Sequence, residues 1–99
     1  MNRLQLDAEV LERETIRYTP AGIPIVACTL RHRAEVVEAG MPRQVEMTLQ
    51  AVAAGLPAGE LERCELGAVI RFGGFLAQRN RNTRAVVFHI TELQYLGKD

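Results

Sequence analysis

The chain has 99 residues, 12 of them basic and 12 acidic, so its formal net charge is zero. A chain of this length is expected to fold as one domain over residues 1–99, with a modest core. Near-neutral charge argues against strong, nonspecific binding of duplex DNA. No apolar run approaches the roughly 20 residues of a membrane span, and no signal-peptide core is visible. We therefore expect a cytoplasmic protein.

The first part of the chain alternates between apolar and polar residues, as half-buried strands do. This pattern predicts a strand over residues 4–10, which residues 16–18 could extend or rejoin. A turn is expected at residues 19–22, which contain proline and glycine. A second strand follows over residues 23–33, and its alternation places three apolar side chains on one face: Val26, Cys28 and Leu30.

The middle of the chain predicts a loop, a strand and a connector. Residues 34–42 include Gly40 and Pro42 and are expected to form a loop. Residues 43–53 alternate again, which predicts a third strand with Val45 and Met47 on its core side and Glu46 facing solvent. The connector over residues 55–67 can hold at most a short helix, beginning near Glu60 and closed by Gly67.

Two further strands are predicted, over residues 68–78 and 85–96. Gly73 and Gly74 interrupt the first of them, which is typical of a bulge or bend. Five strands with a short helix or loop between the third and fourth predict an all-β protein, the five-stranded OB-fold barrel. The last strand is apolar on both faces, because Val87 lies between Val86 and Phe88, and this suggests a subunit interface.

Nothing in the sequence predicts catalysis, a metal site or a cofactor. The chain has no serine, and its two aspartates lie near its ends. His32 and His89 are far apart and have no metal-ligand spacing, and no glycine-rich phosphate motif occurs. Cys28 and Cys64 form no CxxC pair and are expected to be buried free thiols.

Residues 79–84 form the most informative segment, with three arginines in six residues and no acidic group. Guanidinium groups bind phosphate and stack on bases, so this hairpin loop predicts contact with nucleic acid, with a solvated tip as the alternative. On an OB barrel, strands two and three and the last hairpin form the binding side. The predicted DNA-binding residues on that side are Arg17, Tyr18, Arg31, Arg33, Arg43, Arg79, Arg81 and Arg84. For each arginine alone, the alternative is an ordinary surface charge.

Several short motifs stand in the order and spacing of the primosomal replication protein N family. They are Asn2-Arg3-Leu4, Thr19-Pro20-Ala21-Gly22-Ile23-Pro24, Leu30-Arg31-His32-Arg33, Glu38-Ala39-Gly40, Arg43-Gln44, Gly67 with Ile70, Gly74-Phe75 and Val87-Phe88-His89. The chain resembles this family, a homodimeric OB-fold relative of bacterial single-stranded DNA-binding protein, over essentially its whole length.

The resemblance implies a non-catalytic primosome component that binds single-stranded DNA and assists the restart helicase at stalled replication forks. By position, six arginines match basic residues that the family uses for single-stranded DNA: Arg17, Arg33, Arg43, Arg79, Arg81 and Arg84. Two positions depart from some relatives, which carry Trp where Glu46 stands and Phe where Met41 stands. The chain has no Trp, so Tyr18 is the only obvious aromatic substitute, and DNA binding is expected to be weak or rearranged.

Two other functions fit an OB fold. The first is a protein-interaction adaptor that docks a helicase and touches DNA little. The second is an oligosaccharide-binding module, which would need several exposed aromatic residues, and this sequence offers few.

Overall fold

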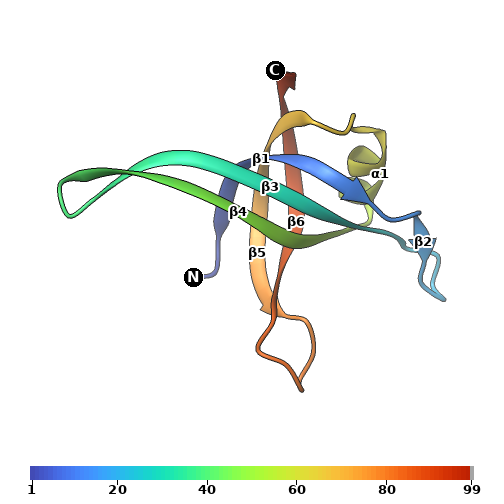
Figure 1. Cartoon of the computed structure of the whole chain (residues 1–99). Coiled ribbons are helices and arrows are strands. Elements are labelled where there is room, and N and C mark those ends of the chain that lie inside the picture. Colours follow the sequence, from blue (N-terminus) through green and yellow to red (C-terminus); the bar gives the residue numbers. More distant parts are fainter. Residues whose placement is uncertain (99) are drawn as a thin grey trace.

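The structure is a computed structural model that describes residues 1–98. It contains six strands and one helix (Figure 1). In chain order they are β1 (Leu4–Arg13), β2 (Arg17–Tyr18), β3 (Pro24–Glu38), β4 (Met41–Ala54), α1 (Leu56–Arg63), β5 (Ala68–Gln78) and β6 (Val86–Lys98). Among residues 1–98 the structure contains no candidate for a membrane-spanning helix.

The five long strands close into a ring. β1 pairs with β5 over residues 4–9 and with β3 over residues 9–13, all antiparallel. β5 continues to β6, β6 pairs in parallel with β4, and β4 pairs with β3. The helix connects β4 to β5, so the predicted OB-fold barrel is confirmed. The two-residue strand β2 adds to the outer edge of β3, which confirms that residues 16–18 rejoin the sheet.

Side chains that point into the ring form the core. Phe72 and Phe88 are fully buried there, and α1 adds Ala58 and Leu61. The predicted inward face of the second strand is confirmed, because its three apolar side chains are buried: Val26, Cys28 and Leu30. Alternation predicts the core correctly in this strand, but not on the third predicted strand, where Val45 is only half-buried and Met47 is exposed because this part of β4 extends away from the core.

The loop predicted over residues 34–42 is wrong. β3 and β4 remain paired out to Glu38 and Met41, and only Ala39 and Gly40 turn the chain, both with positive φ as two-residue hairpins require. The paired strands project from the barrel as an arm (Figure 1). Pro42 is tolerated because β4 pairs with β6 only over residues 51–53, so the arm has an open edge where a missing N–H costs little.

The helix also differs from its predicted bounds. α1 begins at Leu56, with Pro57 in its first turn, and ends at Arg63. Proline suits the first helical turn because the N–H that it lacks has no partner inside the helix. Helix initiation at the proline therefore outweighs the weaker signals near Glu60 and Gly67 that the sequence alone suggested.

The bulge predicted at Gly73 and Gly74 is confirmed. Gly73 lies opposite Glu92 and Gly74 opposite Ile90, so β6 has one extra residue, Thr91, at this point. A Cβ atom on Gly74 would lie 1.8 Å from the carbonyl oxygen of His89. Only glycine permits this close approach of the two backbones.

Candidate functional site

The outer face of the barrel carries the side chains that alternation directs away from the core. On the β3–β4 pair, Arg31 lies opposite Thr48 and Arg33 opposite Glu46. Nearer the barrel end, a row of paired residues crosses four strands from β3 through β4 and β6 to β5: Ala27, Val52, His89 and Phe75. Cross-strand partners share a face, so the arginines of β3 and this row belong to one continuous surface.

Two of the predicted arginines meet at one end of this surface. Arg17 and Arg79 line the same groove, which has a volume of about 260 Å³ and also includes Glu14, Gln50 and His89. More than sixty residues of sequence separate the two arginines, and strand pairing alone brings them together. Among residues 1–98, neither guanidinium has an ion-pair partner.

The basic loop joins β5 to β6 and projects from the barrel (Figure 1). Backbone and side-chain hydrogen bonds shape it: the Arg79 N–H donates to the Ala85 carbonyl at 2.9 Å, and the Asn82 N–H donates to Asn80 Oδ1 at 2.8 Å. Arg81 and Arg84 are exposed, and in the described part of the chain no carboxylate pairs with either side chain. The loop therefore presents its positive charge to solvent.

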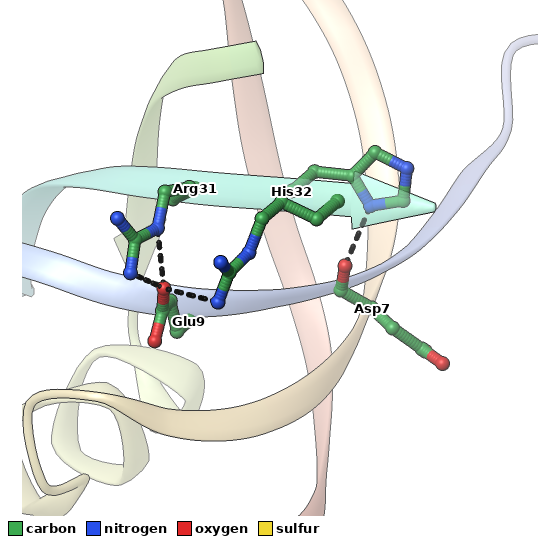
Figure 2. Close-up of polar contacts among 5 residues, drawn as sticks. Asp7, Glu9, Arg31 and His32 are labelled. Atoms are coloured by element: carbon green, nitrogen blue, oxygen red, sulfur yellow. Dashed lines mark hydrogen bonds and ion pairs between the residues drawn. The ribbon is translucent and has the colours of Figure 1, made fainter. Parts of the chain in front are cut away.

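The arginines of β3 are in a different electrostatic state. Arg31 donates to the Glu9 carboxylate (Figure 2), and a guanidinium nitrogen of Arg33 lies 3.7 Å from the same carboxylate oxygen. The Glu9 side chain is only 14% exposed, whereas the Arg33 side chain is 58% exposed, so solvent screens the contact of Glu9 with Arg33 more than the one with Arg31. One carboxylate therefore offsets part of the charge of two candidate DNA-binding residues.

Asp7, two residues before Glu9 on β1, contacts Arg71 and His32. It accepts two hydrogen bonds from Arg71, at 2.7 and 2.9 Å, and this guanidinium holds the pKa of Asp7 below its usual value. The Asp7 carbonyl oxygen lies 2.7 Å from Nδ1 of His32 (Figure 2). His32 is thus held by the backbone of β1.

Two predicted site residues lie away from this face. Arg43 is opposite Val36 and forms an ion pair with Glu38, and alternation along β4 directs it to the other side of the arm from Glu46. Tyr18 follows Arg17 on β2 and so points to the opposite side of that strand. The prediction that Glu46 faces solvent is confirmed, because its side chain is exposed beside Arg33.

An aromatic pair on the outer face was missed from sequence. The rings of Phe75 and His89 are stacked, with centroids 4.8 Å apart and an angle of 5° between their planes. Phe75 is 38% exposed. The available signal was alternation: Ile70 and Phe72 point inward, so Phe75, three residues after Phe72, must point outward.

The two cysteines differ in their burial. Cys28 is buried as expected, and burial raises its pKa to about 12, whereas Cys64 is only half-buried. Within residues 1–98, no group of three or more His, Cys, Asp or Glu side chains is arranged to hold a metal ion.

Comparison with known proteins places this surface in context. Residues 2–92 match the model described as "another single-strand binding protein family". The replication restart protein PriB of Bordetella pertussis (strain Tohama I) is 45% identical over 98% of this chain and 91% of its own. The solved structure of PriB from Ralstonia solanacearum is 47% identical in sequence, with a TM-score of 0.86 over 96% of this chain and 97% of that one. The SSB domain of a Synechococcus protein, 23% identical with a TM-score of 0.68 over 96% of each chain, shares the fold.

Proposed function

The chain belongs to the family of PriB-type replication restart proteins, and on this premise we propose that it binds single-stranded DNA at stalled replication forks without catalysing a reaction. The observation that carries the proposal is the meeting of Arg17 and Arg79 in one groove beside the basic loop. Their guanidinium groups have no carboxylate partner among residues 1–98, so phosphate can bind them without displacing one.

The proposed DNA path runs along the outer face of the sheet. It begins at the Arg17–Arg79 groove and the loop that carries Arg81 and Arg84, and it continues over β4 toward Arg31 and Arg33 of β3. A backbone-tracking groove of this kind suits single strands with little sequence preference. Arg43 and Tyr18, which point elsewhere, make a smaller contribution in this proposal.

Assistance to a replication-restart helicase and other primosome proteins is the second part of the proposal. The competing candidate is an adaptor that docks the helicase and binds DNA little. Two carboxylates favour that candidate, because Glu9 pairs with Arg31 and Arg33, and Glu46 stands beside Arg33 on the same face. The two candidates therefore differ in the DNA affinity of the protein alone.

A titration of labelled oligo(dT) over a range of salt concentrations tests the proposal. Arg17, Arg79, Arg81 and Arg84 have no ion-pair partner among residues 1–98, and if each contacts one phosphate the log–log salt slope is about −3, from roughly −0.7 per phosphate. Single strands should bind more tightly than duplexes of the same length. A slope near zero or a preference for duplex would exclude this path. If unwinding of a forked substrate by the cognate restart helicase then still rises on addition of the protein, the adaptor is the better description.

We also propose that the protein is a homodimer. In the described chain, β1 pairs with β5 over residues 4–9 and with β3 only from residue 9 onward, so residues 4–6 have β5 on one side and an open edge on the other, and at residue 7 the His32 ring already contacts the carbonyl on that edge. An open edge can add a strand from a second copy. Light scattering at micromolar concentration should give about twice the 11.0 kDa mass of one chain, and a persistent monomer would refute the dimer.

Removal of the Glu9 charge should strengthen DNA binding. Glu9→Gln frees Arg31 and Arg33 for phosphate, so oligo(dT) affinity should rise several-fold at low salt, and the salt slope should steepen by about 1.4, from two added contacts. Glu92→Gln is the matched control, since Glu92 pairs with Arg3 of the N-terminal segment. Equal affinities of both variants and the wild type, with folding intact, would place the DNA away from Arg31 and Arg33.

A further inference from the structure

The stacked pair formed by Phe75 and His89 is a surface feature that core packing does not require. The core already contains Phe72 and Phe88, both fully buried, whereas Phe75 stands on the outer face of β5 and is 38% exposed. His89 lies directly opposite on β6. We propose that this pair is a base-stacking platform for single-stranded DNA, an inference that rests on the proposed function above.

The two rings already hold the orientation that base stacking requires. The nearly parallel rings, 4.8 Å between centroids, fix each other's orientation. A side chain that is already immobilised loses little conformational entropy when a ligand binds it. Because every base has a π-face, stacking on such a ring is tolerant of sequence, as expected of a protein that must bind any single strand.

The position of the pair joins stacking to phosphate binding. His89 lines the same groove as Arg17 and Arg79, and its cross-strand partner on β4 is Val52, which lines this groove too. A base stacked on the platform would therefore leave its phosphate beside guanidinium groups that have no carboxylate partner among residues 1–98. An aromatic ring beside a guanidinium group is the combination by which proteins bind single strands, the ring stacking on a base and the cation contacting phosphate.

The proposed platform places base contact at a different part of the barrel from Glu46, the position where some relatives carry Trp. Glu46 provides no stacking surface, and it lies six residues from Val52 along β4, or about 20 Å at 3.3 Å per residue. Bases are therefore expected to stack at the end of the face near the basic loop. The arm end, with Arg33 and Glu46, would contact the backbone of the strand.

Truncation of the ring is the first experiment. Phe75→Ala should weaken oligo(dT) binding about tenfold, the loss of one stacked base, while leaving the salt slope unchanged. An abasic oligonucleotide of the same length should bind the wild type more weakly than oligo(dT) does, and Phe75→Ala should narrow this difference. Tyr95→Ala is the control, because Tyr95 is 60% exposed on β6 but lines a separate groove beside α1.

Tryptophan fluorescence provides a second experiment that keeps a bulky ring in place. The chain has no Trp, so Phe75→Trp introduces a single tryptophan, whose fluorescence oligo(dT) should quench by stacking. The matched variant Tyr95→Trp should not be quenched. An unquenched Phe75→Trp at saturating DNA, or wild-type affinity of Phe75→Ala, would overturn the platform. Either of these two outcomes would contradict the platform but not the proposed DNA binding by the arginine groove. If the wild-type protein does not bind oligo(dT) at all, both the groove and the platform are refuted.

Discussion

Replacement of Arg79, Arg81 and Arg84 together by alanine is expected to weaken binding of oligo(dT) about a hundredfold. If each guanidinium contributes about 1 kcal/mol through a charge-assisted contact with phosphate, three lost contacts amount to a factor of this size. The log–log salt slope should become shallower by about 2, because three fewer phosphates are neutralised. Fluorescence anisotropy at several salt concentrations measures both quantities.

The same substitutions should leave the unfolding temperature nearly unchanged. The three side chains belong to an exposed loop and form no ion pair within residues 1–98. The corresponding triple change to lysine is the matched control: it keeps the charge and should retain most of the affinity. If the alanine variant binds DNA like the wild type, another surface binds the DNA. If the variant is strongly destabilised, the loop has a structural role.

Gly74→Ala is expected to have the largest effect on stability. The added Cβ would lie 1.8 Å from the His89 carbonyl oxygen and 3.1 Å from the Phe88 ring, so the backbones of β5 and β6 must separate beside the core. Forced separation of packed elements costs about 3 kcal/mol, which in a domain of this size lowers the unfolding temperature by roughly 15 °C. Thermal unfolding followed by circular dichroism measures this shift.

Gly59→Ala is the control for that variant. Gly59 lies within α1, and its added Cβ would meet only the flexible end of Arg63, at 3.4 Å. Alanine favours helix by up to about 1 kcal/mol over glycine, so this variant should be as stable as the wild type or slightly more stable. Equal unfolding temperatures for Gly74→Ala and Gly59→Ala would show that the bulge can relax around a side chain.

The amino-acid sequence was enough to predict the five long strands, the place of the short helix between them and the inward faces of the barrel, but not the bounds of α1 or of the arm. These features depend on alternation and turn residues, which are local, and they sufficed to predict an OB barrel and the exposure of Glu46. Local signals misled at the arm, where Gly40 and Pro42 suggested a loop. Cross-strand pairing along an open edge outweighed them, and such pairing depends on the partner strand.

Which candidate site residues lie together depends on long-range strand pairing, which the sequence does not show. Pairing across β3, β4, β6 and β5 brings Arg17 to Arg79, and the register of the β5–β6 pair places Phe75 opposite His89. Strand register also places Glu9 opposite Arg31, which changes the charge that this arginine presents. A sequence shows that a residue is basic or aromatic, but its neighbours come from strands paired at long range, and those neighbours determine whether a guanidinium is available for phosphate or a ring for a base.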